Sequence, residues 1–292
     1  MDVVITYVDG NDPCWKVDYE KFTEVPVMAK RFRDWGTLRY LLRGIEKFMP
    51  FVGRVHLVVS HKTQVPVWSD TDQLNIVLHE QIIPKEFLPT FNSTAIEMFL
   101  HRIPGLDEQY LYFNDDMFPV CPCKETDFFL DGKAYMGMAT NLFATGLYKQ
   151  QCRNADRLAR TISGKSISRR FVRPQHICSP MIKSACEEGY AKAEQQILHS
   201  ISRLREPYNL NQYFFLDFMY HTERLISRKI SNKHFSTAIY SAERISSFIK
   251  NPDRKFCCIN DVRMSEDKFS YYRDVIIEAF EYRLPDKSRF EK

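Results

Sequence analysis

Three short apolar segments of this chain run directly into acidic or amide residues, and this repeated pattern restricts the fold more than any other feature. Short runs of β-branched and aromatic residues predict buried strands. In a parallel sheet the carboxyl ends of the strands meet at one edge, where open α/β sheets bind their ligands. The predicted strands, each with the polar residues that follow it, are Asp2–Val8 with Asp9, Gly10, Asn11 and Asp12, Tyr110–Phe113 with Asn114, Asp115 and Asp116, and Lys255–Ile259 with Asn260 and Asp261.

The first half of the chain alternates between extended and helical patterns. Apolar residues at helical spacing predict helices, and short apolar runs between turn residues predict strands. The order strand, helix, strand, strand, helix, strand favours an α/β fold with a largely parallel, Rossmann-like sheet and helices on both faces. The remaining predictions are a helix at Thr37–Phe48, strands at Val55–Val59 and Asn75–Leu78, and a helix at Thr94–Ile103 that Thr90 or Ser93 could cap.

The second half of the chain has a different pattern. Lys149–Ser168 is polar and basic, which indicates a mobile loop or a small insertion. Helical periodicity predicts helices at Pro180–Ser202, Leu210–Leu225 and Lys268–Tyr282. No internal repeat or low-complexity linker divides the sequence. We therefore expect one compact domain with a helical elaboration in its second half.

Composition and charge bear on the class of protein. The formal net charge is only +4, so charge alone gives no reason to expect a nucleic-acid partner. No apolar run approaches the ~20 residues of a membrane span, and the first predicted strand begins at Asp2. We expect a cytoplasmic protein, with peripheral association at the inner face of the membrane left open. Its eight cysteines are expected to be free thiols, as in a reducing cytosol.

The acidic strand ends suggest a metal site. Adjacent carboxylates such as those of Asp115 and Asp116 repel each other unless a positive charge lies between them. Magnesium prefers a couple of carboxylates together with phosphate oxygens, so Mg²⁺ or Mn²⁺ bridging to a diphosphate would suit these residues. The alternative is turn and capping chemistry, which favours Asp, Asn and Gly in tight loops.

Arginines near the first acidic loop could bind phosphates. Arg33 precedes Asp34, and Arg39 and Arg43 are four residues apart, so these two share one helix face. Guanidinium groups bind phosphate oxygens in a bidentate manner, and together with a metal they could clamp a pyrophosphate. A solvated helix face is the alternative interpretation.

Two further residues are candidates for chemistry. His176 follows a run of basic residues and Pro174, and an imidazole with an ordinary pKa of about 6.5 is a plausible base for a sugar hydroxyl. A lone histidine is more often a structural residue. Arg205 lies in a short basic segment before Pro207, where it either binds phosphate or complements the dipole of a helix carboxyl terminus.

These motifs occur in a defined order along nearly the whole chain. They are Thr6–Pro13 (TYVDGNDP), Arg31–Asp34 (RFRD), Leu88–Ser93 (LPTFNS), Tyr112–Phe118 (YFNDDMF), Arg173–His176 (RPQH) with Arg205–Pro207, and Cys258–Asp261 (CIND). In content and order they resemble the conserved regions of the Stealth family. That family contains bacterial capsule polymerases and the animal enzyme that tags lysosomal glycoproteins with N-acetylglucosamine-1-phosphate.

The resemblance implies a phosphotransferase. An acceptor hydroxyl would attack the phosphorus next to the sugar of a nucleotide-sugar, expected to be UDP-linked, and a nucleoside monophosphate would leave. The group transferred would be a hexose-1-phosphate or an N-acetylhexosamine-1-phosphate. The acceptor would be an oligo- or polysaccharide, free or lipid-linked, in capsule or cell-surface polysaccharide synthesis.

The resemblance also implies roles for the candidate residues. His176 would be the base, with Asp116 the competitor for that role, and Arg205 and Arg39 would stabilise the diphosphate charge. Residues 1–120 would bind the nucleotide-sugar, 121–250 would form a mobile or helical acceptor region, and 251–292 would close a single catalytic domain of 1–292. The expected metal ligands are Asp115, Asp116, Asn260 and Asp261, and the expected nucleotide-sugar contacts are Asp9, Gly10, Asn11, Asp12, Arg33, Asp34, Arg39, Arg43 and Asn92.

Two other functions fit the same residues. A conventional metal-dependent glycosyltransferase also uses an Asp pair after a strand to hold a metal and a nucleotide-sugar, but it leaves no phosphate in the new linkage. A non-catalytic module that binds carbohydrate or nucleotide would tolerate substitution of His176 and Asp116.

Overall fold

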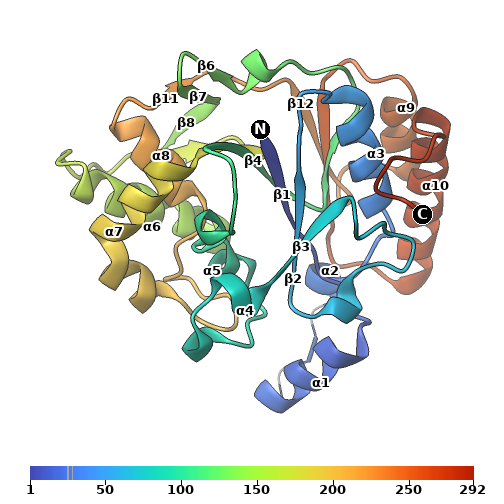
Figure 1. Cartoon of the computed structure of the whole chain (residues 1–292), viewed down its shortest axis with the longest axis horizontal. Helices are drawn as coiled ribbons and strands as arrows, with labels where there is room; N and C mark the ends of the chain where they lie inside the picture. The colour runs from blue at the N-terminus through green and yellow to red at the C-terminus, as the bar shows by residue number, and fades with distance from the viewer. Residues whose placement is uncertain (25, 28) are drawn as a thin grey trace. The chain divides into compact units, whose positions relative to one another are not determined.

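The computed structural model describes residues 1–24, 26–27 and 29–292, and it has the predicted α/β class (Figure 1). The central sheet is mostly parallel, with the strand order β10-β4-β1-β2-β3, and β10 runs antiparallel to β4. Its strands are β1 (Asp2–Thr6), β2 (Val55–Val59), β3 (Leu74–Leu78), β4 (Gln109–Asn114) and β10 (Ser179–Ile182).

The chain divides into two compact units that interleave along the sequence. Unit 1 contains residues 1–4, 77–112 and 125–230, and unit 2 contains residues 5–76, 113–124 and 231–292. Three boundaries between their segments fall within β1, β3 and β4, and the other two follow Lys124 and Ile230. Each unit therefore contains segments that are distant in the sequence.

Unit 2 combines strands with helices from both ends of the chain. Its helices are α1 (Pro13–Phe22), α2 (Ala29–Phe32), α3 (Leu38–Phe48), α9 (Ala242–Lys250) and α10 (Glu266–Arg283), and its further strands are β5 (Met117–Pro119), β12 (Asn232–Ser236) and β13 (Phe256–Asn260). β13 pairs in parallel with β12 and antiparallel with β5. Helices α9 and α10 lie side by side (Figure 1), joined at the surface by Lys250 and Glu278, 3.0 Å apart.

The apolar face of α3 explains its place in unit 2. Leu41, Leu42 and Ile45 are buried at helical spacing, and Tyr40 stacks on Phe280 of α10 with ring centroids 5.4 Å apart. The chain terminus is therefore held against a helix from its first fifty residues, which makes this packing strongly non-local.

Unit 1 is largely helical around small sheets. Its helices are α4 (His79–Ile82), α5 (Ser93–Glu97), α6 (Gly146–Ile162), α7 (Lys183–Ser200) and α8 (Tyr213–His221), and its further strands are β6 (Phe129–Leu130), β7 (Lys133–Met136), β8 (Met138–Asn141), β9 (Phe171–Pro174) and β11 (Leu225–Ser227). Helix α8 is apolar on nearly all sides and is buried. His221 at its end bonds Asp156 of α6 at 2.8 Å, which fastens the two helices together.

Three predictions about unit 1 were wrong in part. Lys149–Ser168 is mainly helix α6, because small apolar residues such as Ala155 and Ala159 are buried beneath an otherwise polar surface. Pro180–Ser202 begins as strand β10, which pairs with β4, before α7 starts. The predicted helix Thr94–Ile103 is interrupted after α5, and Asn92 rather than Thr90 or Ser93 caps it.

Two further observations concern the cysteines and the helices of the described chain. Its eight cysteines are present as free thiols. Among the described residues, no helix combines the length and the apolar character needed to cross a membrane.

Candidate functional site

The loop after β1 makes a close approach to α2. The amide of Gly10 donates to the carbonyl of Phe32 at 2.7 Å, and a Cβ at Gly10 would lie 2.5 Å from that oxygen. Only glycine fits at this position. Asp9 folds the loop by accepting from the amide of Asn11 at 2.8 Å, while Asn11 itself is exposed.

The last acidic residue of this loop has a structural partner. The Asp12 carboxylate accepts from the amide of Trp15 at 2.8 Å and caps α1, with Pro13 at the first helical position. Asp12 is also buried. Capping chemistry, the alternative considered from sequence, therefore accounts for Asp12.

Carboxylates from three separate segments of unit 2 influence one another. Burial, Asp116 and Asp34 raise the pKa of Asp115 to about 8. Burial also raises the pKa of Asp34, with a further contribution from Asp9. Tyr7 has a pKa raised far above its usual range by burial and by Asp34, Asp9 and Asp115. We call Tyr7, Asp9, Asp34, Asp115 and Asp116 the carboxylate cluster. Burial and neighbouring carboxylates therefore oppose the ionisation of Asp115 and Asp34, which a positive charge nearby would favour.

Strand pairing between β5 and β13 positions Asp116. Its carbonyl accepts from the amide of Ile259 at 2.9 Å, and its Oδ2 accepts from the thiol of Cys258 at 3.4 Å. Its Oδ1 is buried and accepts no hydrogen bond from any residue that the structure describes. Buried carboxylate oxygens are usually satisfied, so this oxygen suits a ligand that supplies positive charge.

Asp261 lies just beyond β13 and is tied to the segment around Arg33. Its Oδ2 accepts from the indole nitrogen of Trp35 at 3.2 Å and lies 3.7 Å from Nε of Arg33. The Arg33 guanidinium stacks over Phe269 at 4.2 Å. Its Nη1 is buried and donates to none of the described residues. Arg33 therefore has a fixed orientation and a remaining donor.

The two arginines on α3 differ from each other. Arg39 lies over the ring of Trp68 at 5.0 Å and is partly exposed. Arg43 is buried and binds both carboxylate oxygens of Glu291, at 2.7 and 2.9 Å, and also Glu281 at 3.1 Å. These contacts fasten the chain terminus to α3. They argue against the predicted contact between Arg43 and a nucleotide-sugar.

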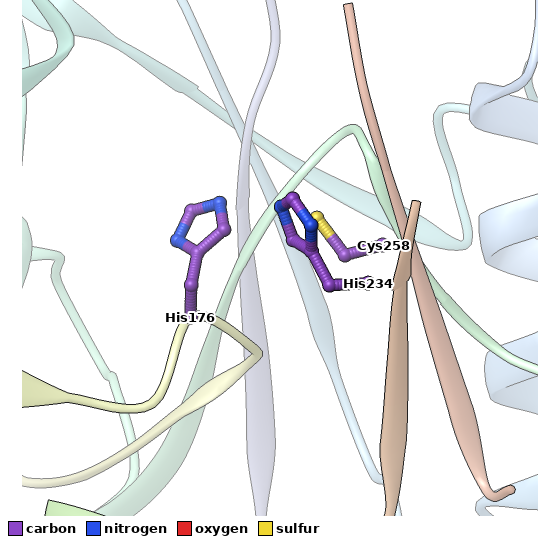
Figure 2. Close-up of side chains that lie close together, drawn as sticks. All are labelled: His176, His234 and Cys258. Carbon is purple, nitrogen blue, oxygen red and sulfur yellow. The ribbon is translucent and has the colours of Figure 1, made fainter. Parts of the chain in front are cut away.

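Asn260 is the last residue of β13 and is exposed. Its carbonyl accepts from the amide of Thr237 at 3.3 Å. Two residues earlier, Cys258 faces the side chain of His234 on the neighbouring strand β12 (Figure 2). The β12–β13 pair thus carries potential metal ligands that differ in kind from the carboxylates.

The carboxylate cluster fits a divalent cation. Carboxylate oxygens are the donors that Mg²⁺ and Mn²⁺ prefer. Asp116 offers a buried Oδ1 to which no described residue donates, and burial, followed by Asp116 and Asp34, raises the pKa of Asp115. The residues present therefore match the expected ion by chemistry.

In unit 1, Asn92 has a structural role. Its amide nitrogen donates to the carbonyl of Ser202 and to the side chain of Asn209, both at 3.0 Å. Its oxygen accepts from the amide of Thr94 at 3.1 Å, which caps α5. These contacts hold the 202–209 segment to α5 and leave little capacity for the predicted contact with a nucleotide-sugar.

Arg205 is held beside a buried carboxylate. Its guanidinium donates to the hydroxyl of Ser93. Glu97 accepts from the amide of Gln212 at 2.8 Å. Burial raises the pKa of Glu97 to about 7, although Gln212 and Arg205 both favour its ionised form. Glu97 is therefore an ionisable group that sequence inspection did not identify.

His176 lies between β9 and β10 and contacts two tyrosines. Its Nδ1 is 3.1 Å from the hydroxyl of Tyr213, which is 2.9 Å from the hydroxyl of Tyr148. Tyr213 is buried, and burial keeps its pKa well above the usual range, so its hydroxyl stays protonated. The hydrogen bond to this neutral tyrosine holds the imidazole ring of His176 in one orientation.

The candidate residues thus fall into two groups. His176, Arg205 and Asn92 belong to unit 1, and the remaining candidates belong to unit 2. Sequence inspection missed Tyr7, Glu97 and Tyr213. Tyr7 directly precedes the first acidic loop and Glu97 follows the Leu88–Ser93 motif, so their positions could have marked both, whereas nothing near Tyr213 in the sequence marks it.

Comparisons with known proteins identify relatives over the full chain. Residues 31–136 match the family model described as Stealth protein CR2, conserved region 2. A capsular polysaccharide phosphotransferase of Streptococcus pneumoniae, WcwK, is 30% identical, and the match covers 100% of this chain and 99% of the relative. A receptor polysaccharide phosphotransferase of Streptococcus oralis, WefC, is 29% identical, with 100% and 99% covered.

Likeness to solved structures is weaker. The galactosyltransferase LgtC, in complex with donor and acceptor sugar analogs, aligns with a TM-score of 0.42 and 10% identity over 99% of this chain and 98% of that one. A similarity at this level supports no inference about substrate or metal.

Proposed function

This chain belongs to the Stealth family, and from that premise we propose that it transfers a hexose-1-phosphate from a nucleotide-sugar to a carbohydrate hydroxyl. A phosphodiester forms between the sugar and the acceptor, and a nucleoside monophosphate leaves. We further propose a UDP-linked donor and an oligo- or polysaccharide acceptor. If the acceptor is lipid-linked, the enzyme works at the inner face of a membrane.

The carboxylate cluster is the observation that carries this proposal. Phosphoryl transfer depends on positioning and on neutralisation of charge more than on covalent help from the protein. Asp115 and Asp116 of the cluster, together with Asp261 just beyond β13, are the residues that would hold Mg²⁺ or Mn²⁺. When bound, the ion neutralises charge on the diphosphate. The unsatisfied Oδ1 of Asp116 supports this assignment.

Neighbouring residues of unit 2 serve the nucleotide-sugar. The close approach of Gly10 to Phe32 shapes the segment Asp9–Asn11. The hydroxyl of Tyr7 donates a hydrogen bond to the carboxylate of Asp34. Arg33, fixed by Phe269 and Asp261, offers its Nη1 to a phosphate oxygen. Arg39 is the second candidate for phosphate. Arg43 and Asn92 are left out of this set because their side chains are committed to other protein groups.

Residues of unit 1 serve the acceptor and the leaving group. We assign His176 as the base that removes the acceptor proton, oriented by Tyr213 through Nδ1. Arg205 stabilises developing phosphate charge. Asp116 is the alternative base.

The fate of phosphorus tests the proposal. With a nucleotide-sugar labelled at the sugar-proximal phosphate, we expect the label in the carbohydrate product as a phosphodiester, together with unlabelled nucleoside monophosphate. The donor's anomeric configuration must be kept, because the bond between sugar and oxygen is never broken. A conventional glycosyltransferase would place the label in a nucleoside diphosphate, and that result would refute the proposal. A binding module would form no product.

A further inference from the structure

Unit 1 exposes a segment that is both apolar and basic. It joins β8 to β9, two antiparallel strands in which Asn141 lies opposite Phe171. The residues that leave β8 and those that enter β9 are therefore at the same end of the strand pair. We call residues 142–170, which include helix α6, the β8–β9 connection. Its helix packs against α8 and β9 of the same unit through a buried face.

Three large apolar side chains of this connection are exposed. Phe143 is 71% exposed, Ile167 59% and Leu142 47%. Apolar residues scattered singly over a surface are ordinary. Leu142 and Phe143, however, are consecutive and follow β8 directly, and Ile167 lies four residues before β9, which begins at the same end of the strand pair. Exposed apolar side chains that gather in this way mark a surface that contacts a protein or a membrane.

The same connection carries a concentrated positive charge. Between residues 142 and 170 the sequence has one acidic residue, Asp156, and seven basic ones: Lys149, Arg153, Arg157, Arg160, Lys165, Arg169 and Arg170. Asp156 is buried and binds Arg160 and His221, each at 2.8 Å. The exposed basic residues are Arg153, Arg157, Lys165, Arg169 and Arg170. The net charge of only +4 for the chain therefore conceals a strong local excess.

We propose that the β8–β9 connection docks on the surface of a lipid bilayer that contains anionic headgroups. Such a surface attracts lysine and arginine side chains, and aromatic and aliphatic side chains insert at the boundary between its headgroups and acyl chains. A bilayer therefore matches both properties of the connection. An anionic polysaccharide would match the positive charge alone, because it has no apolar layer to receive Phe143, Ile167 and Leu142.

The docking surface deepens the proposed function and rests on it for its purpose. Strand β9 has four residues, begins directly after Arg170 and ends two residues before His176, the assigned base. A bilayer held at the start of this strand would bring a lipid-linked acceptor to the unit that carries the base. Binding to lipid itself requires neither the donor nor the acceptor, so it can be measured separately from transfer.

Flotation of the full chain with vesicles tests the positive charge. Vesicles of phosphatidylcholine are compared with vesicles of equimolar phosphatidylcholine and phosphatidylglycerol. We expect binding to the anionic vesicles alone, weakened by rising ionic strength. Arg169→Glu combined with Arg170→Glu should lower the affinity by at least about tenfold. The matched control, Lys16→Glu combined with Lys21→Glu, makes the same change in net charge at exposed lysines of α1 and should lower it by less than about twofold.

Fluorescence quenching tests the apolar contact. Phe143→Trp places an indole at the most exposed apolar position of the connection, and anionic vesicles with brominated acyl chains should quench its emission relative to the parent protein. Ile239→Trp is the control, because Ile239 is 78% exposed and belongs to unit 2; its emission should not be quenched. Phe143→Ser should lower vesicle affinity by about fivefold. All the substituted side chains are exposed, and circular dichroism checks that each variant is folded.

Several results would overturn the proposal. The parent protein might fail to float with anionic vesicles, or the Lys16 and Lys21 variant could lose as much affinity as the Arg169 and Arg170 variant. Equal quenching in the Phe143→Trp and Ile239→Trp variants would mean that the arginines bind anions without a bilayer, as they would on an anionic polysaccharide. If vesicle binding behaves as expected but no phosphotransfer is found, the docking surface stands and the proposed function fails.

Discussion

The carboxylate cluster of unit 2 and the His176–Arg205 region of unit 1 handle charge in opposite ways. In the cluster, burial and the charges of Asp116 and Asp34 raise the pKa of Asp115, and burial and Asp9 raise the pKa of Asp34. In the second region, Arg205 binds Ser93, and His176 bonds Tyr213. The cluster is therefore incomplete without an added positive charge, whereas the second region is already organised by its own hydrogen bonds.

Among the predictions, removal of the metal should lower turnover most. Because the cluster has negative charge in excess, turnover should fall to background after exhaustive chelation and return with Mg²⁺ or Mn²⁺. Nucleoside monophosphate release measures this, with metal content determined in parallel. Full turnover by metal-free protein would mean that the carboxylates do not act through a cation.

Substitution within the cluster should come next. Asp116→Asn keeps the shape of the side chain but removes its charge, and we expect turnover to fall by about 10²–10³-fold. Asp253→Asn, at an exposed carboxylate beside Arg254, is the control and should be neutral. Equal turnover in the two variants would exclude a central role for Asp116.

Substitutions of His176 and Tyr213 should distinguish the base from the residue that orients it. His176→Ala should lower turnover by about 10²-fold or more. Tyr213→Phe should cost about tenfold, within the range for loss of an orienting partner, and should also shift the pH profile of turnover because the hydrogen bond to Nδ1 is lost.

Tyr208→Phe is the control for the tyrosine, since Tyr208 is exposed. If His176→Ala kept near-normal turnover at saturating acceptor, Asp116 would replace it as the base. A Tyr213→Phe variant with lower turnover but an unshifted pH profile would indicate a packing role alone.

The smallest expected effect concerns stability. Glu97 has a pKa raised to about 7 in the folded protein, so its contribution to stability is fully present below its unfolded pKa of about 4.3. That contribution is lost as the pH rises through about 7. Between pH 5 and pH 8 the loss should be at most about 3 kcal/mol. Glu97→Gln should remove this part of the pH dependence.

Urea unfolding at the two pH values compares Glu97→Gln with the parent protein. Glutamine can still accept from the amide of Gln212, so the hydrogen bond is kept while the charge is removed. The same decline in stability in both proteins would show that other groups cause it.

Local patterns predicted several elements well. The strand Val55–Val59 matches β2, and the helix predicted at Thr37–Phe48 matches α3 to within one residue. In each segment the spacing of the apolar residues matches only one kind of secondary structure. The region of α6 was misinterpreted because its polar surface hides a narrow buried stripe that includes Ala155 and Ala159.

The sequence by itself determined that acidic residues follow apolar strands and that the motifs of one family occur in order. Only the tertiary structure decided what each polar residue does. Asp12 and Asp116 both follow such strands, but Asp12 caps a helix through Trp15, whereas Asp116 keeps a buried, unsatisfied oxygen among the residues described. The sequence makes Arg43 a candidate phosphate ligand, but its guanidinium donates to the carboxylate of Glu291, which is 248 residues away. Local composition places a charge, but the partners that satisfy it come from distant segments, and only packing brings those together.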